Sequence, residues 1–411
     1  MISERRRFSG FSNFSQKSGT LPKLLIAGGG YADVPLIHSG RRLGYHVITS
    51  GNRVTDMGHQ YSDECRLEDF SDKEAILRLA KKLKVDAICP CCNDFSAISC
   101  AYAAEEMGLP GHDSYETALI LHHKDQYRKF SRDNHVPSPV GEGFSNALDA
   151  LDTIRGRRFP LMVKPVDLSG GKGITKLEKI EEAPAAIENA LHRSKAGRIV
   201  VEEFIEGSRH GFSAFLRDGR VVFCFLDNEH YYQNPYLVAA ASTPSPAPGS
   251  VSDKLRLETE RISNILNLSD GIFHAQFILR ENEPVMIEVT RRSPGDLYTR
   301  LVEHATGVDY PGYIVKAAAG LDISRLRQEE PRGFFSRVCI MAEREGIVKD
   351  IVFDPWIEDK IIEKIIWGKP GESVDDATTC KLGIVFLKFG SMDEMLAKTE
   401  KMSELIRVIL D

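Results

Sequence analysis

Two lysines and a glycine-rich loop are the first residues of this sequence whose spacing suggests chemistry. Lys124 precedes Lys164, which follows the apolar run Leu161–Val163 and leads into a polar segment. That segment contains Ser169, Gly170, Gly171, Lys172 and Gly173. Glycines let backbone amides approach phosphate oxygens, and lysines neutralise the charge of a polyphosphate. No Gly-Lys-Ser or Gly-Lys-Thr opens a helix here, so the segment predicts a polyphosphate site that is not a P-loop.

Two later regions could complete a nucleotide site. The strand-like run Val200–Glu203 enters a turn at Gly207, where backbone groups could recognise an adenine edge. The residues expected at this turn are Glu202, Glu203, Phe204 and Ile205. The runs Phe273–Phe277 and Val285–Arg292 place polar side chains on two neighbouring strands, where hard oxygen ligands could hold Mg²⁺. The candidate metal ligands are Gln276, Glu288 and Thr290.

The order of these motifs resembles the ATP-grasp superfamily, particularly its carboxylate–amine ligase branch. That branch includes L-amino acid ligases, biotin carboxylase and the carbamoyl phosphate synthetase large chain. The resemblance covers about residues 23–322. It implies that ATP and Mg²⁺ are the cofactors, with Mn²⁺ as an alternative metal. It also implies that a carboxylate attacks the γ-phosphate of ATP, and that an amine then displaces phosphate from the acyl phosphate.

The resemblance assigns roles to individual residues. Lys124 and Lys164 would contact the ATP phosphates, and the loop 169–174 would close over them. Glu202 and Ile205 would meet adenine at a hinge between two lobes. Glu288 would bind Mg²⁺. The expected catalytic residues are Arg292, which would stabilise the acyl phosphate, and Lys172. Phosphoryl transfer between anions needs charge screening more than an acid or base, which suits a site rich in cations.

Three positions depart from the family's pattern. Gln276 stands where a glutamate is usual, Thr290 replaces an asparagine, and Ser208–His210 replaces a stretch that often holds a ribose-binding glutamate. These departures permit an alternative, in which an ATP-grasp protein binds nucleotide without ligase turnover. The residues that argue for an enzyme are Lys124, Lys164, Glu288 and Arg292.

A second glycine cluster, Gly28–Gly30, follows the apolar run Leu24–Ala27. It could be a dinucleotide site, a tight structural turn, or a site for a small anion or substrate. The dinucleotide interpretation is disfavoured, because Asp33 stands where a further glycine is needed and the second strand does not end in an acid. The residues predicted to bind substrate are Gly29, Gly30, His230, Arg292 and Gly295.

The composition excludes several classes of protein. The chain has 411 residues, 42% of them hydrophobic and 27% charged, which is typical of a globular protein with more than one lobe. The net charge of −6 and the lack of a basic stripe argue against a nucleic-acid partner. No apolar run is long enough to span a membrane, and the amino end does not resemble a secretory signal. We therefore expect a cytoplasmic protein with small-molecule carboxylate and amine substrates and no membrane partner. A homodimer is left open.

Strands and helices alternate from residue 23 onward, which predicts an α/β fold that begins with an open parallel sheet. We expect a disordered tail over 1–22 and a pre-ATP-grasp domain over 23–115. A two-lobed ATP-grasp domain should follow over 116–325, with ATP between the lobes and a hinge near 202–207. A small carboxy-terminal α+β domain should cover 326–411. One helix is predicted for 116–134, and a final helix should carry apolar residues from Met395 to Ile409.

Overall fold

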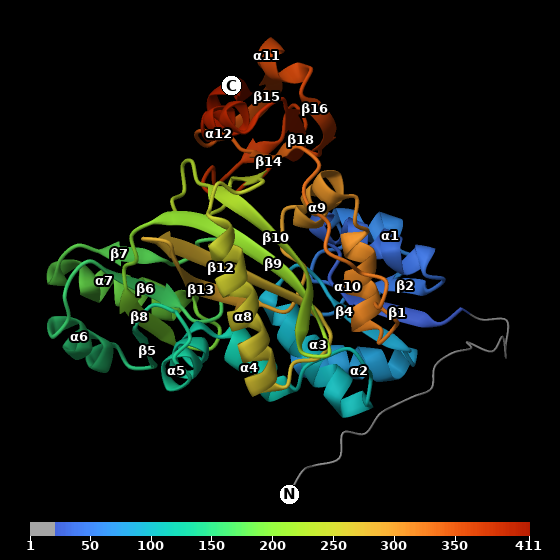
Figure 1. Ribbon diagram of the computed structural model, residues 1–411, viewed down its shortest axis with the longest axis horizontal. Helices are drawn as coiled ribbons and strands as arrows, with labels where there is room; N and C mark the ends of the chain where they lie inside the picture. Colours follow the sequence, from blue (N-terminus) through green and yellow to red (C-terminus); the bar gives the residue numbers. More distant parts are fainter. Residues whose placement is uncertain (1–20) are drawn as a thin grey trace, which may run out of the picture.

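The amino-terminal part is an open parallel sheet flanked by helices (Figure 1). The computed structural model describes residues 21–411, so the predicted tail, except for Leu21 and Pro22, lies outside the described residues. The strand order is β3-β2-β1-β4. The strands are β1 (Lys23–Ala27), β2 (His46–Thr49), β3 (Glu64–Cys65) and β4 (Ala87–Pro90). The helical elements are η1 (Tyr31–Asp33), α1 (Val34–Arg42), η2 (Met57–Tyr61), α2 (Lys73–Leu83) and α3 (Asp94–Met107). The predicted parallel sheet is confirmed, and Leu24–Ala27 is buried on both faces.

Two helices, not one, lead from this sheet to the next unit. They are α4 (Tyr115–His122) and α5 (Lys124–Asp133). The prediction of a single helix is wrong at His123, whose extended backbone (φ −101°, ψ 117°) interrupts the helical turn. The break places Lys124 at the first position of α5.

A small antiparallel sheet with the order β5-β8-β6-β7 forms one lobe of the molecule (Figure 1). Its strands are β5 (Gly141–Phe144), β6 (Leu161–Pro165), β7 (Thr175–Leu177) and β8 (Ile199–Glu203). The short helical turn η3 (Ile180–Glu182) and the helices α6 (Ala147–Arg155) and α7 (Ala183–Arg193) complete the lobe. Apolar residues of α6, α7 and the sheet make a separate core, which indicates that the lobe packs around its own centre.

The largest sheet has eight strands in the order β13-β12-β9-β10-β11-β14-β18-β16. Its first five strands are β9 (Ser208–Arg217), β10 (Arg220–His230), β11 (Ala240–Thr243), β12 (Gly271–Arg280) and β13 (Glu283–Thr290). The other three are β14 (Phe334–Ile340), β16 (Ile361–Ile366) and β18 (Gly383–Phe389). Three helices accompany the sheet: α8 (Gly249–Leu266), α9 (Tyr298–Thr306) and α10 (Tyr310–Ala318). Because β11 pairs with β14, the carboxy-terminal strands extend the central sheet.

The end of the chain adds a small three-stranded sheet, β17-β15-β19, at the top of Figure 1. The elements here are β15 (Gly346–Phe353), α11 (Pro355–Glu358), β17 (Ser373–Val374), α12 (Met392–Glu400), α13 (Met402–Leu405) and β19 (Ile406–Leu410). The predicted final helix is wrong beyond Leu405, because Ile406–Leu410 pairs with β15 instead. This run is rich in β-branched residues, which favour a strand once a partner edge is present.

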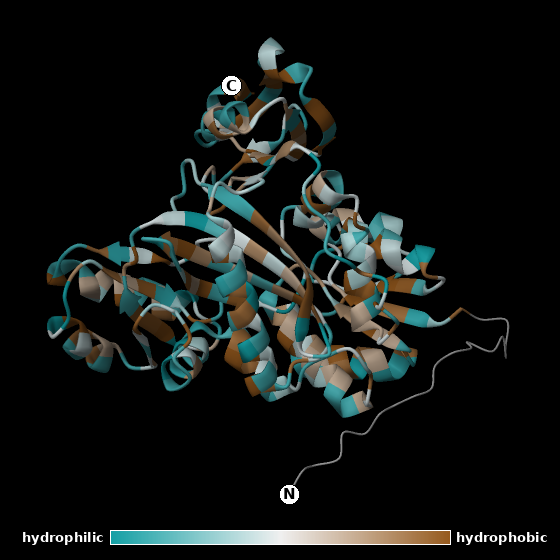
Figure 2. Ribbon diagram, viewed as in Figure 1, coloured by the Kyte–Doolittle hydropathy of each residue, from teal (hydrophilic) through white to brown (hydrophobic). Residues whose placement is uncertain are grey.

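Hydrophobic residues concentrate in the strands and on the inner faces of the helices (Figure 2). The helices of residues 21–411 include none that is long and apolar enough to cross a membrane.

Candidate active site

One cavity of about 310 Å³ lies between the small lobe and the eight-stranded sheet. Residues far apart in the sequence reach it from β6, β8, β10, β12, β13 and β14. The predicted site residues that line it are Lys124, Lys164, Ser169, Gly170, Gly171, Glu202, Glu203, Phe204, Ile205, Gln276, Glu288, Thr290, Arg292 and Gly295. Most of the predicted phosphate, hinge and metal positions, together with Arg292, therefore meet in one place.

Other predicted residues lie outside the cavity lining. Lys172 is exposed, and Gly173 packs against Pro165 and Arg193. The ring of His230 contacts the Ser242 hydroxyl at 2.9 Å, and burial lowers the pKa of His230 to about 4. Its uncharged ring is thus held within the sheet.

The first glycine turn also lies away from the cavity lining. A Cβ atom on Gly29 would lie 2.2 Å from the His59 ring, so this glycine provides a close packing contact. The Gly30 amide donates to the Asp33 carboxylate at 2.8 Å, and the Cys92 amide donates to the same carboxylate at 2.9 Å. Asp33 thus supplies the anion that the turn could otherwise bind. Of the three interpretations of this turn, the geometry favours the structural one.

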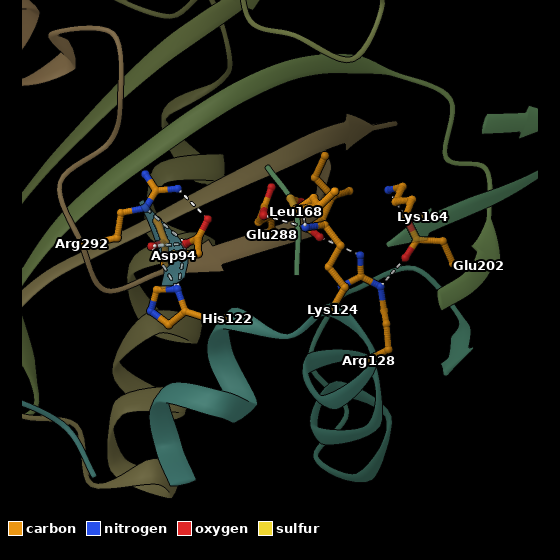
Figure 3. A network of polar contacts seen from close by, with 11 residues as sticks. Asp94, His122, Lys124, Arg128, Lys164, Leu168, Glu202, Glu288 and Arg292 are labelled. Carbon is orange, nitrogen blue, oxygen red and sulfur yellow. Dashed lines mark hydrogen bonds and ion pairs between the residues drawn. The ribbon is translucent and has the colours of Figure 1, made fainter. Parts of the chain in front are cut away.

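A buried ion cluster holds Lys164 on the small-lobe side (Figure 3). The Lys164 ammonium and the Arg128 guanidinium both contact the Glu202 carboxylate, with Arg128 Nε 2.7 Å from Glu202 Oε2. Burial raises the pKa of Glu202, but Arg128 and Lys164 outweigh it and bring the value to about 2. Burial also lowers the pKa of Lys164, and Glu202 opposes this effect. Glu202, expected to contact adenine, thus uses its carboxylate to position two cations.

Lys124 bridges the glycine loop and the metal-ligand strand. Its Nζ donates to Glu288 Oε1 at 2.9 Å and to the carbonyl oxygen of Leu168 at 2.8 Å. Figure 3 shows Lys124 and Glu288 between the Glu202 cluster and Arg292. This position suits a lysine that contacts a phosphate group above Glu288.

Arg292 is held by Asp94 from the amino-terminal sheet (Figure 3). Its Nη2 lies 2.9 Å from Asp94 Oδ2, and burial opposes ionisation of both groups. Their attraction prevails, so the pKa of Asp94 falls well below its usual value and that of Arg292 rises. The Arg291 amide donates to His122 Nε2 at 3.3 Å, so His122 Nδ1 carries the proton that it donates to Asp94 at 2.8 Å. Arg292 is thus the cation paired with Asp94, and His122 is a further hydrogen-bond partner of the same carboxylate.

Arg291 and Arg292 follow the end of β13 at Thr290 and have different environments. Arg291 is bound to Asp113 at 2.8 Å and to backbone carbonyl oxygens, including that of Ser269 at 2.5 Å. These contacts make Arg291 structural, whereas Arg292 lines the cavity.

Gln276 and Glu288 are cross-strand neighbours on β12 and β13 and can offer oxygen atoms to a metal. The Gln276 amide nitrogen donates to Glu229 Oε1 at 2.7 Å, which leaves the Gln276 amide oxygen available. The Thr290 hydroxyl instead donates to Asp94 at 3.1 Å. One carboxylate and one amide oxygen fit Mg²⁺, which usually takes one or two protein carboxylates and completes its shell with phosphates and water.

A family described as "Phosphoribosylglycinamide synthetase, ATP-grasp (A) domain" matches residues 122–233. This region contains Lys124, Lys164, the glycine loop and the hinge strand of the cavity just described. The chain contains an ATP-grasp domain. Enzymes of this superfamily use ATP with Mg²⁺, in agreement with the predicted cofactors.

Individual relatives of this ATP-grasp protein agree with that assignment. It is 25% identical over 354 residues to a formate-dependent phosphoribosylglycinamide formyltransferase of Prochlorococcus marinus (strain MIT 9515), covering 85% of this chain and 88% of the relative. Its fold is similar to that of the L-amino acid ligase from Bacillus licheniformis, with a TM-score of 0.77, 18% identity, and coverage of 96% and 100% of the two chains. The fold is also similar to that of the biotin carboxylase domain of the Hydrogenobacter thermophilus 2-oxoglutarate carboxylase, solved with MgADP, ADP and bicarbonate. The TM-score is 0.75 at 18% identity, and the match covers 96% of this chain and 92% of that domain. The predicted fold class is confirmed.

The cavity of this ATP-grasp protein also contains residues that the sequence did not single out. They are Asp227, Glu229, Arg337 and Lys381. Arg128 and Asp94 lie behind the lining and hold Glu202 and Arg292. The alternation of Asp227 and Glu229 within an apolar strand was the one available signal. Arg337 reaches the cavity because β14 joins the central sheet, and the sequence does not reveal that pairing.

Proposed function

We propose that this ATP-grasp enzyme is an ADP-forming carboxylate–amine ligase that acts through an acyl phosphate. The observation that supports this most directly is the convergence of Lys124, Lys164 and Arg292 with the Glu288 carboxylate in one cavity. Three cations and one carboxylate that can bind a metal match the charge demands of phosphoryl transfer to a carboxylate. A protein that binds nucleotide without turnover finds no support in this site, because the cations are retained and held in place.

Each group would have a separate task. Lys164, positioned by Glu202, and Lys124, positioned by Glu288 and the Leu168 carbonyl, would bind the phosphates of ATP. Arg292, fixed by Asp94, would orient the carboxylate substrate and stabilise charge on the acyl phosphate. Glu288 and the amide oxygen of Gln276 would hold Mg²⁺, which would neutralise charge on the transferred phosphoryl group.

The hinge residues would bind the base of ATP. Glu203, Phe204 and Ile205 line the same cavity as the lysines, and the Glu203 amide donates to the Val140 carbonyl at 3.0 Å. The glycine loop, with Gly170, Gly171 and Gly173 at positive φ, would cover the phosphates. We propose the functional divisions 23–115, 116–325 and 326–411 for the three units.

The acid and the amine are small molecules in this proposal. The formyltransferase relatives are named for formate and phosphoribosylglycinamide, and the ligase neighbour is named for L-amino acids. Formate, acetate and the protein amino acids are therefore the carboxylates to test. Phosphoribosylglycinamide and amino acids are the amines.

The test measures ADP and phosphate release from MgATP by the purified protein with each carboxylate and amine, singly and in pairs. Release should require a carboxylate and should fall at least about a hundredfold in Glu288→Gln and Lys164→Ala, a loss of about 2.7 kcal/mol of transition-state stabilisation. Glu283→Gln is the matched control for the first variant, because Glu283 is an exposed acid on the same strand, paired with Lys254. ATP hydrolysis without a carboxylate, or equal losses in both glutamate variants, would contradict the proposal.

A further inference from the structure

Two acids on β10, the buried Asp227 and the partly buried Glu229, face the cavity without a bonded cation. Asp227, 1% exposed, accepts a hydrogen bond from the Tyr298 hydroxyl at 2.6 Å. Glu229 accepts from the Tyr231 hydroxyl at 2.5 Å and from the Gln276 amide at 2.7 Å. All of these donors are neutral, and neither carboxylate forms an ion pair within residues 21–411. A buried carboxylate is costly unless a cation pairs with it.

The contrast with Asp296, another acid of this cavity, shows that the arrangement is specific. Lys381 Nζ lies 2.6 Å from Asp296 Oδ1, and Arg337 and Tyr31 add further contacts. These cations overcome burial and lower the pKa of Asp296. Burial instead raises the pKa of Asp227 to about 7, since no cation is bonded to it. Asp227 and Glu229 thus lie where a positive charge would be favourable, and no residue of 21–411 is bonded there to supply it.

Two polar atoms of other residues that line the cavity also lack hydrogen-bond partners. His274 Nδ1 and Arg337 Nε are buried and make no hydrogen bond to the described part of the chain. His274 is 7% exposed and Arg337 is 2% exposed, and both side chains line the cavity. A ligand with polar groups of its own is therefore expected beside the acids.

The acids lie beside the place where an acyl phosphate would form. Gln276 pairs with Gly211 on β9, and Gly211 pairs with Asp227 on β10. A Cβ atom at position 211 would lie 2.6 Å from Asp227 Oδ1, so the glycine leaves space for this carboxylate. Tyr298 links Asp227 to His274. Its hydroxyl contacts Asp227, and the centroid of its ring lies 5.1 Å from that of the His274 ring.

We propose that Asp227 and Glu229 bind the ammonium group of the amine substrate, and that Asp227 accepts the proton that this group loses before its nitrogen attacks the acyl phosphate. This inference rests on the proposed ligase function and adds the site and protonation state of the nucleophile. Primary amines reach the enzyme as ammonium ions, which have no lone pair for attack.

The proton and electron balance follows from this arrangement. Transfer of one proton from the ammonium to Asp227 frees the nitrogen lone pair, which forms the C–N bond to the acyl carbon. The C–O bond to phosphate then breaks, and phosphate leaves with the electron pair. The nitrogen's second proton goes to the departing phosphate, and Asp227 returns its own proton to solvent after the amide leaves.

The test separates the two halves of the reaction with a neutral nucleophile. Hydroxylamine is uncharged near neutral pH, so it can trap an acyl phosphate as a hydroxamate without an ammonium site. Wild type, Asp227→Asn and Glu229→Gln are compared with MgATP and each carboxylate of the panel, using either hydroxylamine or the protein amino acids and phosphoribosylglycinamide as amines. Asp218→Asn is the matched control, because Asp218 is an exposed acid at the turn between β9 and β10.

Asp227→Asn should lower kcat/KM for the amine at least about a hundredfold, a loss typical of a removed general base, while hydroxamate formation stays within about threefold. Glu229→Gln should mainly raise KM for the amine. Equal loss of both products, no loss of either, or a loss that extra Mg²⁺ restores would overturn the inference but leave the ligase function intact. A wild-type protein that forms neither hydroxamate nor ADP with any carboxylate would overturn the ligase function and this inference together. Thermal unfolding and ATP binding confirm that each variant is folded.

Discussion

The carboxylate of Glu202 lies between two buried cations, Lys164 and Arg128, and is itself 1% exposed. Removing its charge leaves both cations unpaired in the interior, so Glu202→Gln should destabilise the protein by about 3–5 kcal/mol at pH 7. The pKa of Glu202 lies below its unfolded value, so this contribution is present above about pH 4.5 and is lost as the pH falls toward 2. Urea denaturation at pH 7 and pH 3.5 should therefore show a smaller difference between variant and wild type at the lower pH.

Glu283→Gln provides the comparison at the same scale. Glu283 pairs with Lys254 at 2.5 Å, but both side chains are exposed to solvent. An exposed ion pair contributes at most about 1 kcal/mol, so this change should alter the free energy of unfolding little. If the two glutamine variants lost equal stability, the cluster at Glu202 would not be the structural support of Lys164.

Asp227 should show the opposite effect on stability. Its pKa rises from 3.8 in the unfolded chain to about 7 in the fold, chiefly through burial, with Glu229 raising it further and Tyr298 and Arg337 opposing. Stability from this group is therefore full below about pH 3.8 and falls as the pH rises through 7. Asp227→Asn removes this loss. The free energy of unfolding of the variant, relative to that of wild type, should therefore rise by about 2.7 kcal/mol between pH 5 and pH 8. Calorimetry of the ligand-free proteins at both pH values measures the change, and a pH-independent effect would contradict it.

At the scale of elements, the glycine loop is held in a backbone conformation that side chains rarely adopt. Gly171 has φ +75°, and a Cβ atom there would lie 2.9 Å from the Tyr236 carbonyl oxygen. Gly171→Ala should therefore displace the loop, at a cost of about 1–2 kcal/mol, and raise KM for ATP about tenfold. Gly197→Ala is the matched control, because Gly197 has φ +62° with no atom near its Cβ position. Steady-state kinetics should show the increase only in the Gly171 variant.

The strands were predictable where apolar runs met turn residues. Leu161–Val163 and Val285–Val289 were found in this way, because a buried strand needs a continuous or alternating apolar pattern. The break at His123 and the strand Ile406–Leu410 were not found. The first depends on the backbone angles of one residue, and the second depends on an edge of β15 that lies far away in the sequence.

The candidate site shows the same division between local and distant information. Lys164 and the glycine loop are neighbours in the chain, so the sequence revealed them together. Arg128 and Asp94 act only through Glu202 and Arg292, whose positions relative to them come from the folded structure. Asp227 reaches the cavity because Gly211, on the neighbouring strand, has no side chain.

At the scale of the whole molecule, Asp296 joins three distant parts of the chain. It is bonded to Lys381 in the carboxy-terminal region, to Arg337 on β14 and to the Tyr31 hydroxyl in the amino-terminal unit. Tyr31 also stacks on Trp367 with ring centroids 4.3 Å apart. The cavity wall and the junction between the first and last parts of the molecule therefore share one buried acid.

Loss of this acid should loosen the junction. Asp296→Asn leaves Lys381 and Arg337 without a bonded anion, which costs about 3–5 kcal/mol for a buried pair. The chain has two tryptophans, so Trp356→Phe leaves Trp367 as the only tryptophan, and the stacking of Trp367 on Tyr31 makes its fluorescence a reporter of the junction. In that background, Asp296→Asn should lower the urea midpoint of the Trp367 signal. Asp309→Asn is the control, because Asp309 also contacts the amino-terminal unit, through Arg42, but at an exposed position. Equal midpoints for the two variants would show that Asp296 does not hold the junction together.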